Sequence, residues 1–189
     1  ESALLMKFCS RLAKDLNDWL ATDEAKEWTD RTNVKVTTLA YHATFEAPVI
    51  LNEETGKYEV TAPEIAMDED LLVQYCTRNA DRFSSLNSSA NASYRDNFKA
   101  WADVTEQMSI WKYNQAWYGE RLQWNGYFSC MQEDYKFMFE CGVSQVMDEG
   151  QASGTCFTAF QNLRGFLAGN LHWDCNQDYQ ALIDSYFNR

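Results

Sequence analysis

The sequence predicts an α/β fold with a parallel sheet. Segments rich in β-branched residues alternate with segments whose apolar residues recur every three or four positions, the pattern of strands joined by helices. Hydrophobic residues make up 46% of the chain and aromatic residues 15%, enough apolar material to bury a core. A length of 189 residues suits a single domain over residues 1–189, complete or part of a larger one.

The first part of the chain is expected to hold a helix, two strands and a hairpin. The β-branched run Val34–Tyr41 and the apolar run Leu71–Cys76 are typical of strands. Between them, residues 49–60 indicate a small hairpin that turns near Thr55 and Gly56. A helix with one apolar face is predicted over residues 2–20, and that face comprises Leu5, Phe8, Leu12, Leu16, Trp19 and Leu20.

A polar loop over residues 84–93 precedes a second series of helices and strands. Short strands are predicted at Met108–Trp111 and Val143–Met147, the latter ending at the acidic stretch before Gly150. Helices are predicted where apolar side chains recur at spacings of three and four, at Tyr94, Phe98 and Trp101; at Met131, Tyr135, Met138 and Phe139; at Phe160, Leu163, Leu167 and Leu171; and at Tyr179, Leu182, Ile183, Tyr186 and Phe187.

Four predicted strands leave two architectures open. One is a complete, small, doubly wound sheet, and the other is half of an eight-stranded (β/α) barrel of the TIM type. A four-stranded half has two unpaired edges, so it needs another segment or a second copy beside it. Pairing of the open edges in a homodimer, or pairing with the missing half of the barrel, is the expected solution.

Charge and motifs exclude several classes of function. Asp and Glu total 28 against 16 Lys and Arg, a net charge of −12, which argues against binding to nucleic acid or to an anionic membrane surface. We expect no membrane span and no signal peptide at Glu1. Nucleotide-binding glycine motifs and the serine-hydrolase elbow are absent. Six cysteines without a C-x-x-C pair and two histidines give no zinc pattern, so no metal or cofactor is expected.

Several stretches resemble the bacterial domain-of-unknown-function family 4838, and they follow the order found in that family. The stretches are Val36–Tyr41, Ile110–Tyr113, Cys141–Val143 with Met147–Gly150, and Leu163–Trp173 with Leu182–Asp184. The resemblance implies the C-terminal part, about four β/α units, of a glycoside-hydrolase-like barrel from a carbohydrate-active protein. It also implies that earlier barrel strands precede Glu1, and that the protein acts outside the cell or on its surface.

If the barrel prediction holds, the site lies at the carboxyl ends of the strands. Glycoside hydrolysis needs two carboxyl groups around the scissile bond, and this chain offers one acidic strand end, where Asp148 or Glu149 is the candidate catalytic carboxylate. The second group would come from the missing half, so the fragment alone is expected to be inactive. The family favours an acidic residue where this chain has Lys112, and its acidic residue before the glycine matches either Asp148 or Glu149. The alternative is a solvated acidic loop before the next helix.

A glycan is the expected substrate, and seven residues are the candidates to bind it. Aromatic rings offer flat apolar faces to sugars, and polar side chains can hydrogen-bond their hydroxyl or carboxylate groups. The candidates are Tyr41, His42, Arg78, Trp111, Tyr113, Asn114 and Trp117. The competing interpretation for each aromatic residue is core packing, and His172, at a helix end, is given no function. A non-catalytic glycan-binding module and a purely structural module remain the alternatives to an enzyme.

Overall fold

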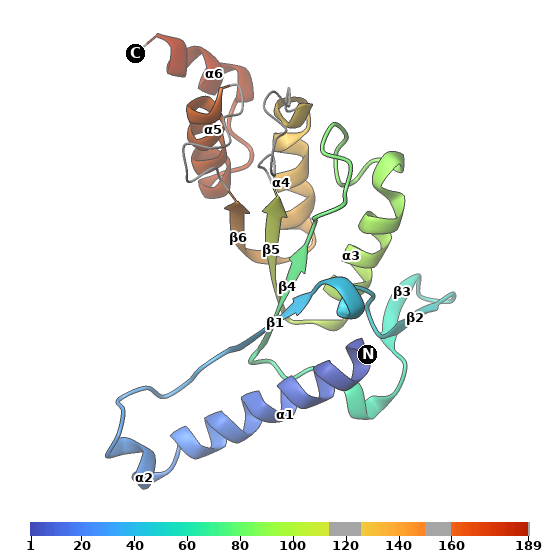
Figure 1. Ribbon diagram of the computed structural model, residues 1–189, viewed down its shortest axis with the longest axis vertical. Helices are drawn as coiled ribbons and strands as arrows, with labels where there is room; N and C mark the ends of the chain where they lie inside the picture. The colour runs from blue at the N-terminus through green and yellow to red at the C-terminus, as the bar shows by residue number, and fades with distance from the viewer. Residues whose placement is uncertain (114–125, 150–159, 189) are drawn as a thin grey trace. The chain divides into compact units, whose positions relative to one another are not determined.

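The computed structural model describes residues 1–113, 126–149 and 160–188 (Figure 1). The helices are α1 (Ser2–Leu20), α2 (Asp23–Lys26), α3 (Ala92–Val104), α4 (Met131–Glu140), α5 (Gln161–Trp173) and α6 (Tyr179–Phe187). The strands are β1 (Val36–Ala40), β2 (Val49–Asn52), β3 (Lys57–Val60), β4 (Leu71–Cys76), β5 (Gln107–Tyr113) and β6 (Val143–Glu149). The predicted helices and strands are therefore present, with ends that differ by a few residues.

The four strands outside the β2–β3 hairpin form one sheet in the order β1-β4-β5-β6. β1 runs parallel to β4, with Val36 opposite Leu71 and Ala40 opposite Tyr75. Helices connect the later strands, so the predicted α/β class with a parallel sheet is confirmed. The strands follow chain order, without the reversal that defines a doubly wound sheet.

The predicted hairpin is also confirmed. β2 and β3 pair antiparallel, with Asn52 opposite Lys57. Gly56 adopts a φ of +69° in the turn between them, a conformation that side chains with a Cβ rarely adopt.

Internal contacts divide the chain into two compact units. The first unit comprises Glu1–Cys76 and Asp96–Ile110, and the second comprises Thr77–Arg95 and Trp111–Arg189. No helix in the described part of the chain is long and apolar enough to cross a membrane.

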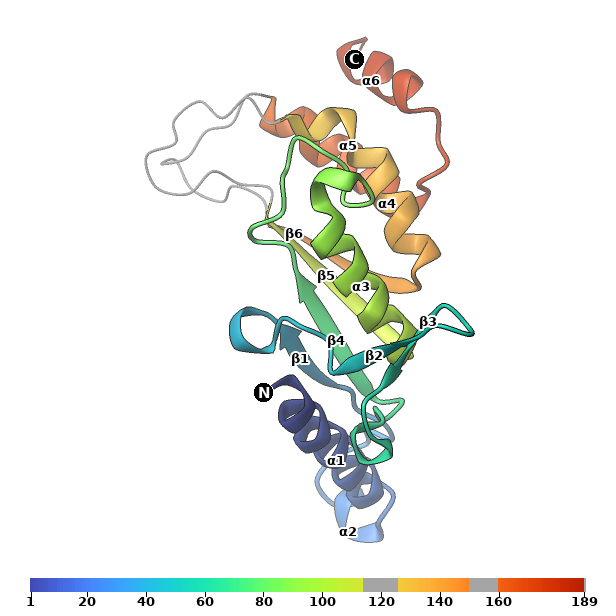
Figure 2. The ribbon, with the colours of Figure 1, turned by 90° about the vertical axis from the view of Figure 1, so that its right-hand side faces the viewer.

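In the first unit, α1 packs against β1 and β4 (Figure 2), but not through the face that periodicity predicted. Its buried positions include Met6, Cys9 and Ala13, whereas Phe8 is 65% exposed. Four of the six residues of the predicted apolar face are exposed instead of packed on the sheet: Phe8, Leu12, Leu16 and Trp19. Alanine and cysteine are small, which lets the helix lie close to the sheet, and the larger residues remain outside.

Asn97 on α3 fixes the segment that follows β1. Its side-chain Oδ1 accepts a hydrogen bond from the Ala47 backbone N–H at 2.9 Å, and its Nδ2 donates to the Phe45 carbonyl at 2.9 Å. The same carbonyl accepts a second hydrogen bond from Trp101 Nε1 at 2.9 Å. Trp101 is fully buried and Asn97 nearly so, so these bonds satisfy backbone groups that water does not reach easily.

Replacing Asn97 with Ala is expected to lower the free energy of unfolding by about 2 kcal/mol, because it leaves the Ala47 N–H without its acceptor. Urea unfolding followed by circular dichroism measures the change. The matched control is Asn87→Ala at an exposed asparagine, which we expect to change stability by less than about 0.5 kcal/mol. Equal stabilities of the two variants would contradict this role of Asn97.

Candidate functional site

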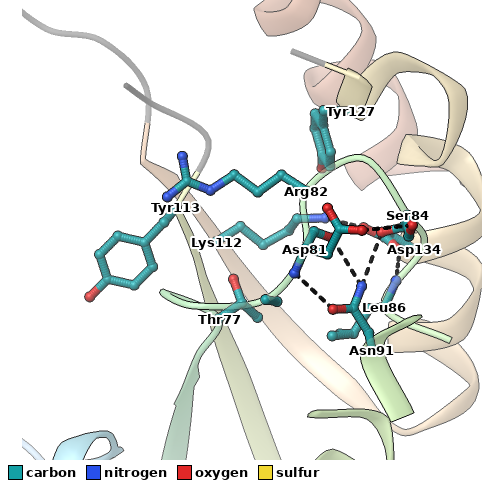
Figure 3. Close-up of a pocket in the computed structure, with 11 residues that line it drawn as sticks. Thr77, Asp81, Arg82, Ser84, Leu86, Asn91, Lys112, Tyr113, Tyr127 and Asp134 are labelled. Carbon is teal, nitrogen blue, oxygen red and sulfur yellow. Dashed lines mark hydrogen bonds and ion pairs between the residues drawn. The ribbon is translucent and has the colours of Figure 1, made fainter. Parts of the chain in front are cut away.

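The candidate site lies in the second unit, where β5 and β6 end at Tyr113 and Glu149. Successive side chains of a strand point to opposite faces of the sheet. Lys112 points toward α4, and Tyr113 points away from it (Figure 3). The site therefore has a face turned toward α4, here called the helix-side face, and a face turned away from α4, here called the open face, and each contains one of the two candidate carboxylates.

On the helix-side face, Lys112 and Asp134 of α4 form a buried ion pair. Lys112 Nζ lies 2.6 Å from Asp134 Oδ2, and each side chain is only 6% exposed (Figure 3). The other oxygen, Asp134 Oδ1, accepts a hydrogen bond from the Leu86 backbone N–H at 2.7 Å. Lys112 Nζ also lies 4.2 Å from the centre of the Tyr127 ring, a cation–π contact. The pair thus joins β5, α4 and the loop after β4.

Asp148 belongs to the same helix-side network. Tyr127 donates a hydrogen bond to the Tyr135 hydroxyl at 3.1 Å, and Tyr135 donates to Asp148 Oδ2. His172 Nε2 lies 2.9 Å from the same oxygen and donates to it, because an ionised carboxylate only accepts.

These contacts set the ionisation of Asp148. Burial raises its pKa, but the hydrogen bond from His172, the positive charge of Lys112 and the hydrogen bond from Tyr135 outweigh burial and leave the pKa below the ordinary value. Burial and the charge of Asp148 raise the pKa of Tyr135 well above 10, so the phenol keeps its proton and remains a donor. Asp148 is therefore an anion with fixed partners, a poor source of protons at neutral pH.

The open face brings together Glu149, Trp111 and Tyr113. Trp111 Nε1 donates a hydrogen bond to Glu149 Oε2 at 2.9 Å. The Trp111 and Tyr113 rings are stacked, with centroids 5.4 Å apart and planes within 3° of parallel. Trp111 and Glu149 are partly exposed and Tyr113 is buried. Tyr113 therefore supports the Trp111 ring, and the indole orients the carboxylate.

A small cavity lies at the ends of β4 and β5, between Thr77, Arg82 and Lys112 (Figure 3). Its volume is about 30 Å³, room for one or two water molecules and not for a sugar ring. Asn91 holds the loop beside it: its Nδ2 donates to the Asp81 carbonyl at 3.0 Å, and its Oδ1 accepts from the Asp81 N–H at 2.8 Å.

The other predicted binding residues lie elsewhere. Arg78 is exposed on the loop after β4. Tyr41 and His42 belong to the first unit, where their rings are 3.9 Å apart and His42 has a φ of +49°. Asn114 and Trp117 fall outside the described residues.

Sequence reasoning missed the helix-side network. In the sequence Lys112 stands out only as a departure from the family pattern, and nothing there assigns a function to His172. A signal was present for Asp134, which follows Met131 by three positions and precedes Met138 by four, on the apolar side of a helix. An acidic residue at such a position needs a buried partner, and Lys112 is a single charge within an apolar strand.

A family model with the description Domain of unknown function (DUF4838) matches residues 16–189, most of the chain. No curated protein matches the chain. The solved structures contain no match either.

Replacing Lys112 with Met is expected to lower the free energy of unfolding by about 3–5 kcal/mol, because it leaves Asp134 charged and buried without its partner. Adding Asp134→Asn should recover at least about 1 kcal/mol, since the amide is neutral and its oxygen still accepts from the Leu86 N–H. Urea unfolding of both variants gives the two values. A double variant less stable than Lys112→Met alone would contradict the pairing.

Replacing Asp148 with Asn is expected to lower the free energy of unfolding at pH 7 by about 2 kcal/mol. Because the folded-state pKa of Asp148 is lowered, the unfolded chain takes up this proton first as pH falls. The stabilisation is therefore present above about pH 4 and is lost as pH falls below that value. Urea unfolding at a series of pH values checks this, and a difference that persists unchanged to about pH 2 would refute an ionised Asp148.

Proposed function

The chain belongs to the family described as Domain of unknown function (DUF4838), and on that premise we propose that it is the C-terminal part of a (β/α) barrel that hydrolyses glycosidic bonds. Glu149 is the proposed catalytic carboxylate, and Trp111 is the proposed sugar-binding ring. The observation that carries the proposal is their arrangement on the open face, where Trp111 Nε1 donates to Glu149 Oε2 at 2.9 Å and Tyr113 stacks against the indole.

The strand arrangement supports a barrel segment over a doubly wound sheet. The strands lie in the order β1-β4-β5-β6, which is chain order once the hairpin is set aside. A barrel is built by adding each strand beside the one before it, and its catalytic residues come from the carboxyl ends of the strands. Glu149 is the last residue of β6 and Tyr113 the last of β5. Closure of a barrel requires further strands, which we propose pair with β1 and β6.

The electrostatics favour Glu149 over Asp148 as the reacting group. Hydrolysis of a glycoside needs one carboxyl group to protonate the leaving oxygen and a second to act as base or nucleophile. Asp148 is held ionised by Tyr135, His172 and the charge of Lys112, so it has no proton to give, and its Oδ2 already accepts hydrogen bonds from two side chains. Glu149 is partly exposed on the face that also carries Trp111. The second carboxyl group is proposed to come from the remaining strands.

A non-catalytic glycan-binding module is the second candidate. The hydrogen bond from Trp111 to Glu149 favours it, because this bond fixes the ring orientation whether or not the carboxylate reacts. Stacking of a sugar on an aromatic ring needs no acid.

In the intact protein, Glu149→Gln is expected to reduce the turnover of a hydrolysed glycan by roughly 100- to 10,000-fold, because the amide neither donates nor accepts the proton that the reaction requires. Affinity for the same glycan should change by less than about threefold, since the amide oxygen still accepts from Trp111. A panel of aryl glycosides and polysaccharides measures turnover, and calorimetry measures binding. Glu140→Gln, at an exposed glutamate on α4, is the matched control and should leave both unchanged.

The outcomes separate the two candidates. Full turnover in Glu149→Gln would reject Glu149 as the catalytic group. Binding of a glycan by the unmodified protein without any turnover would favour the binding module. Unchanged glycan affinity in Trp111→Ala would reject both, because each depends on that ring.

A further inference from the structure

The second unit contains a pocket that the helix-side network only borders. It is bounded by α4, by β6 and by the end of α5 with the segment after it, and its volume is about 410 Å³. Pockets of roughly 300–1,000 Å³ are typical of small-molecule sites. Tyr135 and His172 of the network line this pocket, whereas Asp148, Lys112 and Asp134 do not. The pocket is therefore large enough to hold a ligand of its own.

The pocket lies over a face of β6 and not at the free edge of this strand. Ser144 and Val146 line it, and they are separated from Asp148 by even numbers of residues, so all three side chains lie on one face of the sheet. That face is the helix-side face, because Asp148 contacts Tyr135 of α4 and His172 of α5. Strands that pair with the free edge of β6 extend the sheet sideways and do not occupy this face. The pocket is thus compatible with a closed barrel.

Aromatic and apolar side chains make up much of the pocket. Tyr135, Met138 and Leu171 are buried and give it an apolar base. Phe139 and Trp173 also line it, and they are 71% and 91% exposed, so their rings are available to a ligand. The face of an aromatic ring attracts cations as well as apolar groups. This lining suits a ligand with an apolar part and a positive charge.

The charge around the pocket favours the same class of ligand. Asp174 lines the pocket, and its Oδ1 accepts from the Asn176 N–H at 2.9 Å, while its Oδ2 makes no hydrogen bond within the described part of the chain. His172 donates through Nε2 to Asp148, so Nδ1 of the neutral imidazole is an acceptor, and no described residue donates to it. Neither lysine nor arginine is among the described residues that line the pocket. A cation therefore finds acceptors here, and an anion finds no basic partner.

We propose that this pocket binds a small organic ammonium ion, a primary amine joined to a flat apolar group. The apolar group packs against Met138 and Leu171, beside the ring of Trp173. The ammonium group donates to Asp174 Oδ2, with His172 Nδ1 as a second acceptor. This site is independent of the proposed glycan site, which lies on the open face.

Three probes of similar shape and different charge test the proposal: phenethylamine, phenethyl alcohol and phenylacetate. NMR titration of the chain at about pH 8, where an ordinary imidazole is neutral and an alkylamine is charged, measures their binding. We expect a dissociation constant on the order of 1 mM for the amine. The alcohol and the carboxylate should bind at least about fivefold more weakly, because neither carries a positive charge. The signals that shift should be those of residues 143–146 and 171–176, which include the indole N–H of Trp173.

Two variants locate the ligand within the pocket. Asp174→Asn removes the charge but keeps the oxygen that accepts from the Asn176 N–H, so it should weaken the amine about fivefold and leave the alcohol unchanged. Ser144→Phe, at an exposed position of β6 that lines the pocket, should fill the space and abolish binding of all three probes. Circular dichroism and urea unfolding check that this variant folds. The matched control is Asp184→Asn, at an exposed aspartate on α6, which should change neither affinity.

Three results would each overturn the proposal. The first is no shift of these signals at about 20 mM phenethylamine, a concentration well above the expected dissociation constant. The second is an alcohol or a carboxylate that binds as tightly as the amine. The third is an amine affinity that Asp174→Asn lowers no more than Asp184→Asn does.

Discussion

The second unit depends on one buried ion pair, Lys112 with Asp134. Removing two charges from water costs several kcal/mol per ion, so the pair persists only where each partner satisfies the other. Asp134 also binds the Leu86 N–H, and Lys112 packs over Tyr127. A strand, a helix and a loop are thereby held at one point, and the rest of the site is built around it.

Asp148 and Glu149 are neighbours in sequence, yet they have different chemistry because β6 alternates its side chains. The charge of Lys112 and the hydrogen bonds from His172 and Tyr135 stabilise the anion of Asp148. Asp148 therefore anchors the end of the strand, and this anchoring fixes the backbone from which Glu149 extends toward Trp111.

Local sequence patterns predict much of this fold, but they predict less of the candidate site. β-branched runs and helical spacing predicted the strands and helices, because these signals depend on near neighbours along the chain. The buried face of α1 was predicted incorrectly, since Ala13 and Cys9 face the sheet for reasons of size while Phe8 carries the stronger hydrophobic signal. The contact between Lys112 and Asp134 spans 22 positions, and no local pattern specifies such a partner. The sequence did predict three residues of the site, because they lie at or near the ends of predicted strands: Trp111, Tyr113 and Glu149.

The alternation in β6 also makes the site sensitive to register. Insertion or deletion of a single residue between Val143 and Met147 would rotate both carboxylates to the opposite faces of the sheet. After an insertion Asp148 would take the place of Glu149 beside the indole, and after a deletion the longer Glu149 would take the place of Asp148 between α4 and α5. A length change in this strand would therefore be more damaging than most substitutions, whereas an insertion after Glu149 would leave the assignment of the two faces intact.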